Sequence, residues 1–252
     1  MRADDPDFPK ISHLIGSDAS LAAAMLQTVN SAFYGLRTKA TSVRQAIVLL
    51  GLSNVTQLVT SVLMRNSFPD CDSELMDEYW QSSLTIAQVS KVLAGKFKGV
   101  NRDEAHTFAL FRDCGMLAMM DAYQDYVPLF AGAETPDGVT VTALENERHK
   151  IDHALVGYNL TKMWLLPEDI CQSVLWHHDY AVLRDGAAHI PAACIRHVAL
   201  ALVAERIFVQ RSRGIDSQAW RDSGDFAQDI LQVSREALDA VTEEITQDTA
   251  IF

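Results

Sequence analysis

Residues 42–59 read SVRQAIVLLGLSNVTQLV, and their apolar side chains recur with the spacing of one buried helical face. The first series falls at i, i+3, i+4 and i+7, on Val43, Ala46, Ile47 and Leu50. A second series begins after the glycine, on Val55, Leu58 and Val59. Gly51 stands where the end of a helix favours a left-handed residue. The stretch therefore predicts two consecutive helices joined at Gly51.

Helical spacing continues on both sides of this stretch, and no segment alternates apolar and polar residues as a half-buried strand would. The predicted helices lie at about residues 22–29, 75–95, 104–120, 153–164, 167–178, 189–210 and 226–241. Residues 126–146 hold two prolines and two glycines, and we expect them to form a loop over a cleft. The predicted fold class is all-α.

Composition narrows the class of protein. The chain has 252 residues, 48% hydrophobic and 21% charged, which suffices for a buried core. A net charge of −12 opposes non-specific binding to nucleic acid or anionic lipid. The longest uncharged stretch, residues 45–64, is too polar to span a bilayer. Four widely spaced cysteines and an acidic N-terminus without a secretory signal indicate a soluble, cytoplasmic protein with no membrane partner.

Two helices joined by a short turn at Gly51 also describe a helix-turn-helix DNA reader. Its exposed face would carry polar side chains and one arginine: Asn54, Gln57, Thr60, Ser61 and Arg65. A duplex reader needs several basic contacts to phosphate, which this acidic chain does not supply here. Nucleic acid is therefore the least favoured partner, and a corner between two packed helices is the favoured interpretation.

Histidines gather near predicted helix ends. Asp152 and His153 are adjacent before one helix, and His177 and His178 are adjacent at the end of the next. Imidazoles and carboxylates paired on neighbouring helices bind divalent metals in helical phosphohydrolases. Neighbouring residues on a helix point about 100° apart, so both His177 and His178 reach one ion only near a frayed end. Structural histidines with ordinary hydrogen bonds are the competing interpretation.

Several motifs then follow one another along the chain. The first half carries SDASLAAAMLQTVNSAFYG at residues 17–35, followed by the stretch at 42–59. The second half carries EYWQSS (78–83), ALFRDCG (109–115), ERHKIDHALVG (147–157), MWLLP (163–167) and WHH (176–178). With these motifs the chain resembles the HDOD domain, a relative of the HD-type metal-dependent phosphohydrolases, from about residue 8 to 205.

The resemblance implies a multi-helix bundle like that of HD domains, with an N-terminal helical subdomain. We expect the HDOD domain at residues 1–210, divided into an N-terminal helical part at 1–66 and an HD-like core at 74–210. Residues 211–252 are then a C-terminal helical extension.

The resemblance also implies a metal site that this chain has partly lost. Catalytic HD enzymes hold metal with an early His, a His-Asp pair and a late Asp. Here the early His falls near Trp80, the His-Asp pair reads Arg112-Asp113, and the late Asp falls near Leu202. A guanidinium has no lone pair for a metal, and its fixed charge opposes a cation beside it. We therefore expect the first metal site to be absent, and we assign no catalytic residue.

A second site remains open as a hypothesis. The resemblance matches Asp113, His153, His177 and His178 to the positions that hold the second ion in two-metal relatives, and this donor set suits zinc, iron or manganese. The favoured interpretation is a polar core without any cofactor, in which Arg112 pairs with Asp113 or Asp152 and the histidines form hydrogen bonds. Arg112 and Asp152 would then line a regulatory cleft.

Two functions follow from these residues. The leading hypothesis is a bacterial signal-transduction protein whose HDOD domain is a non-catalytic regulatory module. Such a module would contact a signalling protein or sense a small ligand such as a nucleotide or cyclic dinucleotide. The alternative is a metal-dependent phosphohydrolase or phosphodiesterase that uses the four candidate ligands, which would also require an activated water and an open coordination position.

Overall fold

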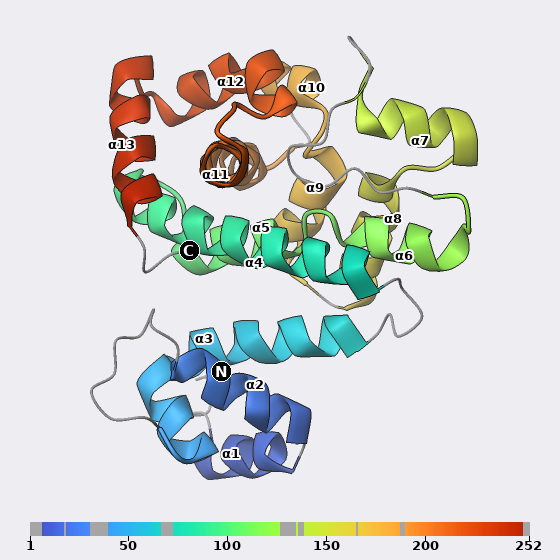
Figure 1. Ribbon diagram of the computed structural model, residues 1–252. Coiled ribbons are helices and arrows are strands. Elements are labelled where there is room, and N and C mark those ends of the chain that lie inside the picture. The colour runs from blue at the N-terminus through green and yellow to red at the C-terminus, as the bar shows by residue number, and fades with distance from the viewer. Residues whose placement is uncertain are drawn as a thin grey trace. The chain divides into compact units, whose positions relative to one another are not determined.

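The computed structural model describes residues 7–17, 19–30, 40–66, 73–126, 135, 139–164, 166–186 and 190–248. Every regular element in these ranges is an α-helix, which confirms the predicted all-α class. The chain divides into two compact units, Met1–Pro69 and Asp70–Phe252, and each is described by itself (Figure 1).

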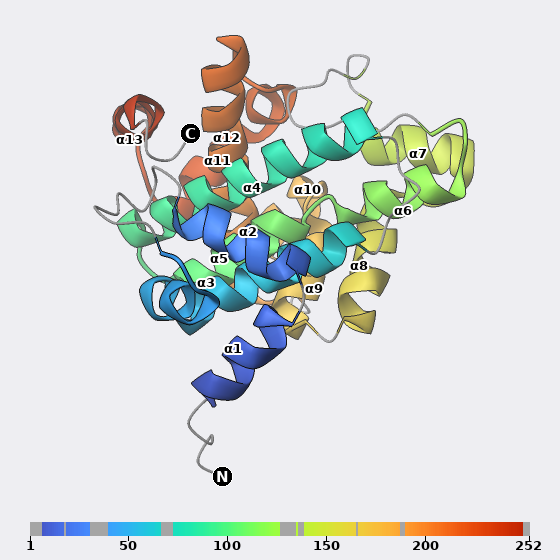
Figure 2. The same cartoon turned by 60° about the horizontal axis from the view of Figure 1, so that its bottom comes forward.

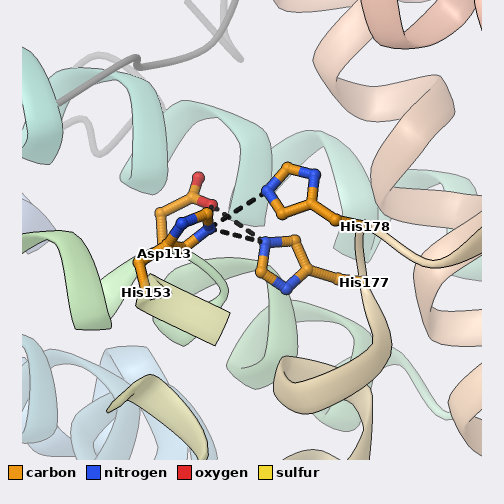
Figure 3. Close-up of side chains that lie close together, drawn as sticks. All are labelled: Asp113, His153, His177 and His178. Carbon is orange, nitrogen blue, oxygen red and sulfur yellow. Dashed lines mark hydrogen bonds and ion pairs between the residues drawn. The ribbon is translucent and has the colours of Figure 1, made fainter. Parts of the chain in front are cut away.

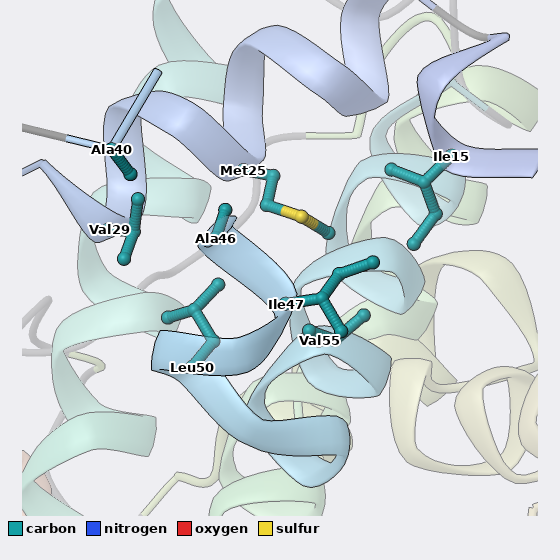
Figure 4. Packing of buried hydrophobic residues seen from close by; sticks show 8 residues of the cluster. All are labelled: Ile15, Met25, Val29, Ala40, Ala46, Ile47, Leu50 and Val55. Carbon is teal, nitrogen blue, oxygen red and sulfur yellow. The ribbon is translucent and has the colours of Figure 1, made fainter. Parts of the chain in front are cut away.

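The first unit contains three helices: α1 (Phe8–Gly16), α2 (Ala19–Val29) and α3 (Val43–Asn66). All three helices pack against one another. Their shared core is a cluster of apolar side chains, shown in Figure 4: Ile15, Met25, Val29, Ala40, Ala46, Ile47, Leu50 and Val55. Asn30 supports this core, because its side-chain amide donates to the carbonyl of Ala40 at 2.9 Å and its oxygen accepts from the Ala40 amide at 2.7 Å.

The turn predicted at Gly51 is present as a kink inside α3. Gly51 has φ 75° and ψ 159°, a conformation that residues with a side chain rarely adopt. Several polar side chains after the kink bond to their own helix, since the Asn54 amide donates to the Leu50 carbonyl and the Thr60 hydroxyl to the Thr56 carbonyl. The side chains of Ser61 and Arg65, which complete the postulated DNA-reading face, lie outside the described part.

The second unit is built around one long helix, α11 (Ala192–Arg213). Its middle, from His197 to Ile207, is buried on every side, as expected of a helix at the centre of a bundle. Figure 1 shows α11 end-on, surrounded by the helices that pack against it. These are α4 (Ser73–Lys96), α5 (Arg102–Phe111), α9 (Glu168–Trp176), α12 (Gln218–Leu231) and α13 (Arg235–Gln247).

A second layer packs at one end of this unit. It consists of α6 (Cys114–Ala122), α7 (Val141–His149) and α8 (His153–Met163), whereas the short α10 (Tyr180–Asp185) packs against α12 and α9. Helix α8 packs against both α6 and α9, and α7 packs against α8. In both views α7 and α13 lie at opposite ends of the unit (Figures 1 and 2).

Three sequence expectations about single elements were wrong. The helix expected at residues 104–120 breaks at Arg112 and Asp113, where Asp113 takes φ −102° and ψ 16°. Part of the loop expected at 126–146 is helical, because Thr140 caps α7 by accepting from the Ala143 amide. The single last helix is two helices, α12 and α13, separated at Gln232, which has a left-handed φ of 53°.

The last two helices pack on α11 within the second unit. Arg206 of α11 forms an ion pair next to each of them: its Nε lies 2.8 Å from an oxygen of Asp216, just before α12, and its Nη1 lies 2.7 Å from an oxygen of Asp239 in α13. Its guanidinium carbon also lies 4.4 Å from the ring centre of Trp220, within range of a cation–π contact. No helix among the described residues combines the length and apolar character needed to cross a membrane.

Candidate metal site and the adjoining arginine

Four polar side chains meet where several helices of the second unit begin or end (Figure 3). Asp113 lies in the break between α5 and α6, His153 is the first residue of α8, and His177 and His178 follow the last residue of α9. Because α9 has already ended, the two adjacent histidines turn toward the same point. The structure therefore brings together the four residues that the sequence proposed as ligands.

Glycine allows α6 to approach α8 closely enough to form this cluster. A Cβ atom on Gly115 would overlap the carbonyl oxygen of His153, and one on Gly157 would lie 2.9 Å from a methyl group of Val174. Both contacts are closer than a real Cβ allows, so a larger residue at Gly115 would push the backbone of α8 away and one at Gly157 would displace the Val174 side chain or its helix. The two glycines thus permit His153 to lie beside Asp113.

One face of the Asp113 carboxylate points at the three imidazoles, and we call this group the histidine face: Asp113 Oδ1, His153, His177 and His178. His177 Nε2 lies 3.3 Å from Asp113 Oδ1 and 3.3 Å from His153 Nε2. His178 Nε2 lies 3.0 Å from His153 Nε2, and His153 Nε2 lies 3.8 Å from Asp113 Oδ1. All four ligand atoms lie within 4.8 Å of one another.

The partners of the outer ring nitrogens determine which nitrogens carry protons. His153 Nδ1 lies 2.7 Å from Glu145 Oε2, and His177 Nδ1 lies 2.7 Å from the carbonyl oxygen of Val174. A carboxylate and a carbonyl only accept hydrogen bonds, so both Nδ1 atoms are donors. In the neutral rings both Nε2 atoms then hold lone pairs that face each other and Asp113 Oδ1. His178 Nε2 can donate to the lone pair of His153 at 3.0 Å, but the lone pairs of His177 Nε2 and Asp113 Oδ1, 3.3 Å apart, still need a cation or a further proton between them.

This donor set fits a divalent metal ion. Zinc binds imidazole nitrogen at about 2.0–2.1 Å, so two ligand atoms of a tetrahedral site are about 3.3–3.4 Å apart. The separations from His177 Nε2 to Asp113 Oδ1 and to His153 Nε2, both 3.3 Å, agree with this spacing. The contact from His153 Nδ1 to a carboxylate is also the outer-shell partner that metal-binding histidines usually have.

The other oxygen of Asp113 belongs to a different group, which we call the arginine face: Asp113 Oδ2, Arg112 and Glu205. Arg112 Nε and Nη2 lie 3.1 and 2.9 Å from Asp113 Oδ2, and Nη1 lies 3.0 Å from Glu205 Oε2 of α11. All three residues are buried. The guanidinium thus bridges two carboxylates, so its charge is compensated on both sides.

Burial and the neighbouring charges shift the pKa values of groups on both faces. Burial opposes ionisation of Asp113, but Arg112 and His177 hold the pKa of this carboxyl well below its usual range. Burial raises the pKa of Glu205 against the opposing effect of Arg112. Burial also lowers the pKa of His177 and, more strongly, that of His178. The imidazoles of His177 and His178 are therefore held neutral, the protonation state that binds metal.

Asp152 and Arg112 have different partners in the structure, although the sequence suggested both for one cleft. Asp152 caps α8, where its Oδ1 accepts from the Leu155 amide at 2.8 Å, and its Oδ2 accepts from the Asn146 side chain at 2.6 Å. The carboxylates that pair with Arg112 are Asp113 and Glu205. Of the two pairings that the sequence allowed, the structure contains the one with Asp113.

Sequence reasoning missed two buried carboxylates of the site. Glu205 lies one helical turn beyond Leu202, the position matched to the late Asp, so a search of the neighbouring turn would have found it. Glu145 was assigned to a loop, although its place eight residues before His153 is fixed by α7. Its hydrogen bonds to His153 and Tyr126 lower its pKa against the opposing effect of burial, so Glu145 is ionised.

Comparison with known proteins identifies the family. The model of the HDOD domain family matches residues 1–180, so the chain belongs to the HDOD domain family. A curated relative, an uncharacterized protein of Treponema pallidum (strain Nichols), is 23% identical over 177 residues. The match takes in 69% of this chain and 34% of the relative, so the chain spans about a third of that protein's length.

Solved structures share the fold. A provisionally named phosphohydrolase from Shewanella amazonensis SB2B matches with a TM-score of 0.72 and 18% identity, over 99% of this chain and 86% of that chain. A provisionally named signal transduction protein from Marinobacter aquaeolei VT8 matches with a TM-score of 0.68 and 16% identity, over 99% of this chain and 55% of that chain. At these identities the likeness concerns the fold alone.

Proposed function

We propose that this chain is a regulatory module of bacterial signal transduction that binds one divalent ion on the histidine face and does not hydrolyse phosphoesters. One observation carries the proposal: the buried guanidinium of Arg112 lies 2.9 Å from Asp113 Oδ2 and 3.0 Å from Glu205 Oε2. A permanent guanidinium charge thus lies between two carboxylates that could otherwise attract a second cation.

The chemistry of the arginine face argues against hydrolysis. In two-ion phosphoester cleavage the two ions stabilise the attacking and the leaving oxygens, and the nucleophile is an activated water. The guanidinium supplies charge on the arginine face, but it cannot lower the pKa of a bound water as a metal does, and it does not lose its proton. Its contacts with Asp113 and Glu205 also engage three of its N–H donors, which reduces what remains for a substrate.

Asp113, His153, His177 and His178 would hold the single ion, and zinc, iron and manganese suit these donors. Such an ion would supply a fixed positive charge that joins the break after α5 to the start of α8 and the end of α9. In this role His177 and Asp113 hold helix ends together, and the module offers a surface whose shape depends on the ion.

Membership of the HDOD family and the fold shared with the Marinobacter protein support a role in signalling. We propose a signalling protein as the partner, contacted directly by the module. A nucleotide or cyclic dinucleotide bound without turnover is the form that small-ligand sensing would take.

The test is turnover of phosphoesters with added manganese. Wild type and His177→Ala are compared on an aryl phosphate, nucleotides and cyclic dinucleotides, and the proposal predicts equal background rates for both proteins. Turnover by wild type that His177→Ala lacks would overturn the non-catalytic assignment. Calorimetry with the same nucleotides then separates binding without turnover from no binding.

A metal-dependent phosphohydrolase is the second candidate, because four ligand atoms lie within 4.8 Å of one another in a protein of this fold. The Shewanella protein with the same fold is provisionally named a phosphohydrolase. This candidate predicts manganese-dependent turnover that is lost in His177→Ala and in Asp113→Asn alike.

A further inference from the structure

Glu145 is the most extensively engaged carboxylate beside the histidine face. From α7 its Oε2 accepts from the backbone amide of His153 at 3.0 Å and lies 2.7 Å from His153 Nδ1. Its Oε1 lies 2.9 Å from the same Nδ1 and accepts from the Tyr126 hydroxyl at 2.6 Å. Glu145, Tyr126 and His153 are all buried. These contacts make a chain from Tyr126 through Glu145 to His153.

We propose that Glu145 is a positioning residue that keeps the proton of His153 on Nδ1 and its Nε2 lone pair on the histidine face, with Tyr126 holding Glu145 in place. The metal-binding consequence rests on the function proposed above, whereas the effect on the proton of His153 does not.

The geometry gives the physical reason. A carboxylate has no proton to donate when ionised, so only the tautomer with hydrogen on Nδ1 bonds to Glu145. The same carboxylate accepts the backbone amide of His153, one of the first amides of α8, which have no partner within their own helix. Ring orientation and helix start are therefore set by a single group. Tyr126 donates to Glu145 from the other side, which limits rotation of the carboxylate.

Replacement of Glu145 by glutamine separates these effects. An amide has one accepting oxygen and one donating nitrogen, so in Glu145→Gln the nitrogen faces either Tyr126 or His153. Where it faces His153, it favours the tautomer with hydrogen on Nε2, which removes the lone pair from the histidine face. Tyr126→Phe leaves the carboxylate in place, so it perturbs the ring less.

The first experiment uses the metal-free full chain. Nitrogen-15 NMR of the histidine side chains reports which ring nitrogen of His153 carries the proton. We expect Nδ1–H in wild type, a mixture of tautomers in Glu145→Gln, and a smaller change in Tyr126→Phe. The control is Glu147→Gln, since Glu147 is an exposed residue of the same helix. A wild-type His153 protonated on Nε2, or a tautomer unchanged in both variants, overturns the inference.

The second experiment titrates zinc into the same four proteins. Loss of an outer-shell partner weakens metal binding about 10–100-fold, which is the change expected for Glu145→Gln, with none for Glu147→Gln. If wild type and Glu145→Gln bind zinc equally well and His153 has the same tautomer in both, Glu145 has no positioning role, and the proposed function still stands. A tautomer that depends on Glu145 in a wild type that binds no zinc supports the positioning role and contradicts the proposed metal site. If Glu145→Gln does not fold, Tyr126→Phe decides. Without the hydroxyl that holds Glu145 Oε1, the carboxylate can rotate away from His153, so this variant must show the smaller tautomer change and weaker zinc binding.

Discussion

The two oxygens of Asp113 face opposite kinds of surroundings. On the arginine face, donors and acceptors match, because the guanidinium of Arg112 lies between Asp113 Oδ2 and Glu205. On the histidine face, Asp113 Oδ1 and the Nε2 lone pairs of His153 and His177 meet within 3.8 Å, and His178 Nε2, 3.0 Å from His153 Nε2, can donate to one of them only. The contrast shows how one carboxylate can pair with a fixed positive side chain through one oxygen and leave the other oxygen among lone pairs that suit a cation.

The largest expected effect comes from breaking the arginine face. Arg112→Met removes the guanidinium and leaves Asp113 and Glu205 buried without their shared partner. Such a loss costs about 3–5 kcal/mol of unfolding free energy, measured by urea denaturation. Arg184→Ala is the control, because Arg184 pairs with Asp225 on the surface and should change stability by at most about 1 kcal/mol. If the two variants lose equal amounts of unfolding free energy, Arg112 contributes no more to stability than a surface arginine does.

A smaller effect is expected from Gly115→Ala, which acts on the histidine face through the backbone. The added methyl group would overlap the carbonyl of His153, so α6 must move away from α8. Overpacking of this kind costs about 1–3 kcal/mol, and the movement should weaken metal binding in parallel. Gly16→Ala is the control, because its Cβ would meet nothing within 4 Å. Full stability in Gly115→Ala would mean that the close approach of the helices is not required.

A buried histidine outside both faces, His197, should make the stability of the protein depend on pH. His197 lies 3.1 Å from the Ser173 hydroxyl, and burial lowers its pKa from the ordinary 6.5 to about 4. Below pH 6.5 the unfolded chain therefore binds a proton that the folded chain does not, so stability falls as the pH drops from 6.5 toward 4. His197 alone should lower the free energy of unfolding by about 1 kcal/mol between pH 6.5 and pH 5.5.

The measurement is the urea midpoint at pH 7, 6.5 and 5.5 for wild type and His197→Gln. The variant should lose less stability than wild type on acidification, by about that amount. If the urea midpoints of the two proteins change equally with pH, His197 is not a neutral, structural histidine, and it does not differ in this respect from the histidines of the histidine face.

Much of the fold could be predicted from local pattern. The kink at Gly51, the cap at Asp152 and the delivery of His177 and His178 at a helix end all depend on residues close together in the chain. These features follow from helical period and capping chemistry, which act within a few residues. The gathering of Asp113, His153, His177 and His178 was predicted through family resemblance and is present in the structure.

The remaining features depend on contacts between distant residues. The break at Arg112 and Asp113 interrupts a stretch whose periodicity is helical, and it arises where α6 turns to approach α8 through Gly115. The pairing of Arg112 with Glu205 joins residues 93 positions apart (205 − 112), and no local rule selects Glu205 over other carboxylates. Tertiary packing decides such pairings, which is why Asp152 was an equally good candidate in the sequence.

The number of divalent ions bound per chain tests the contrast between the two faces most directly. Elemental analysis of protein saturated with zinc or manganese and then freed of unbound metal gives this number, with His177→Ala as the control. We predict one ion per chain in wild type, because the guanidinium of Arg112 occupies the arginine face. In His177→Ala, which lacks one ligand, we predict a clear loss of that ion. Two ions per chain would contradict the account, and so would a wild type that retains none.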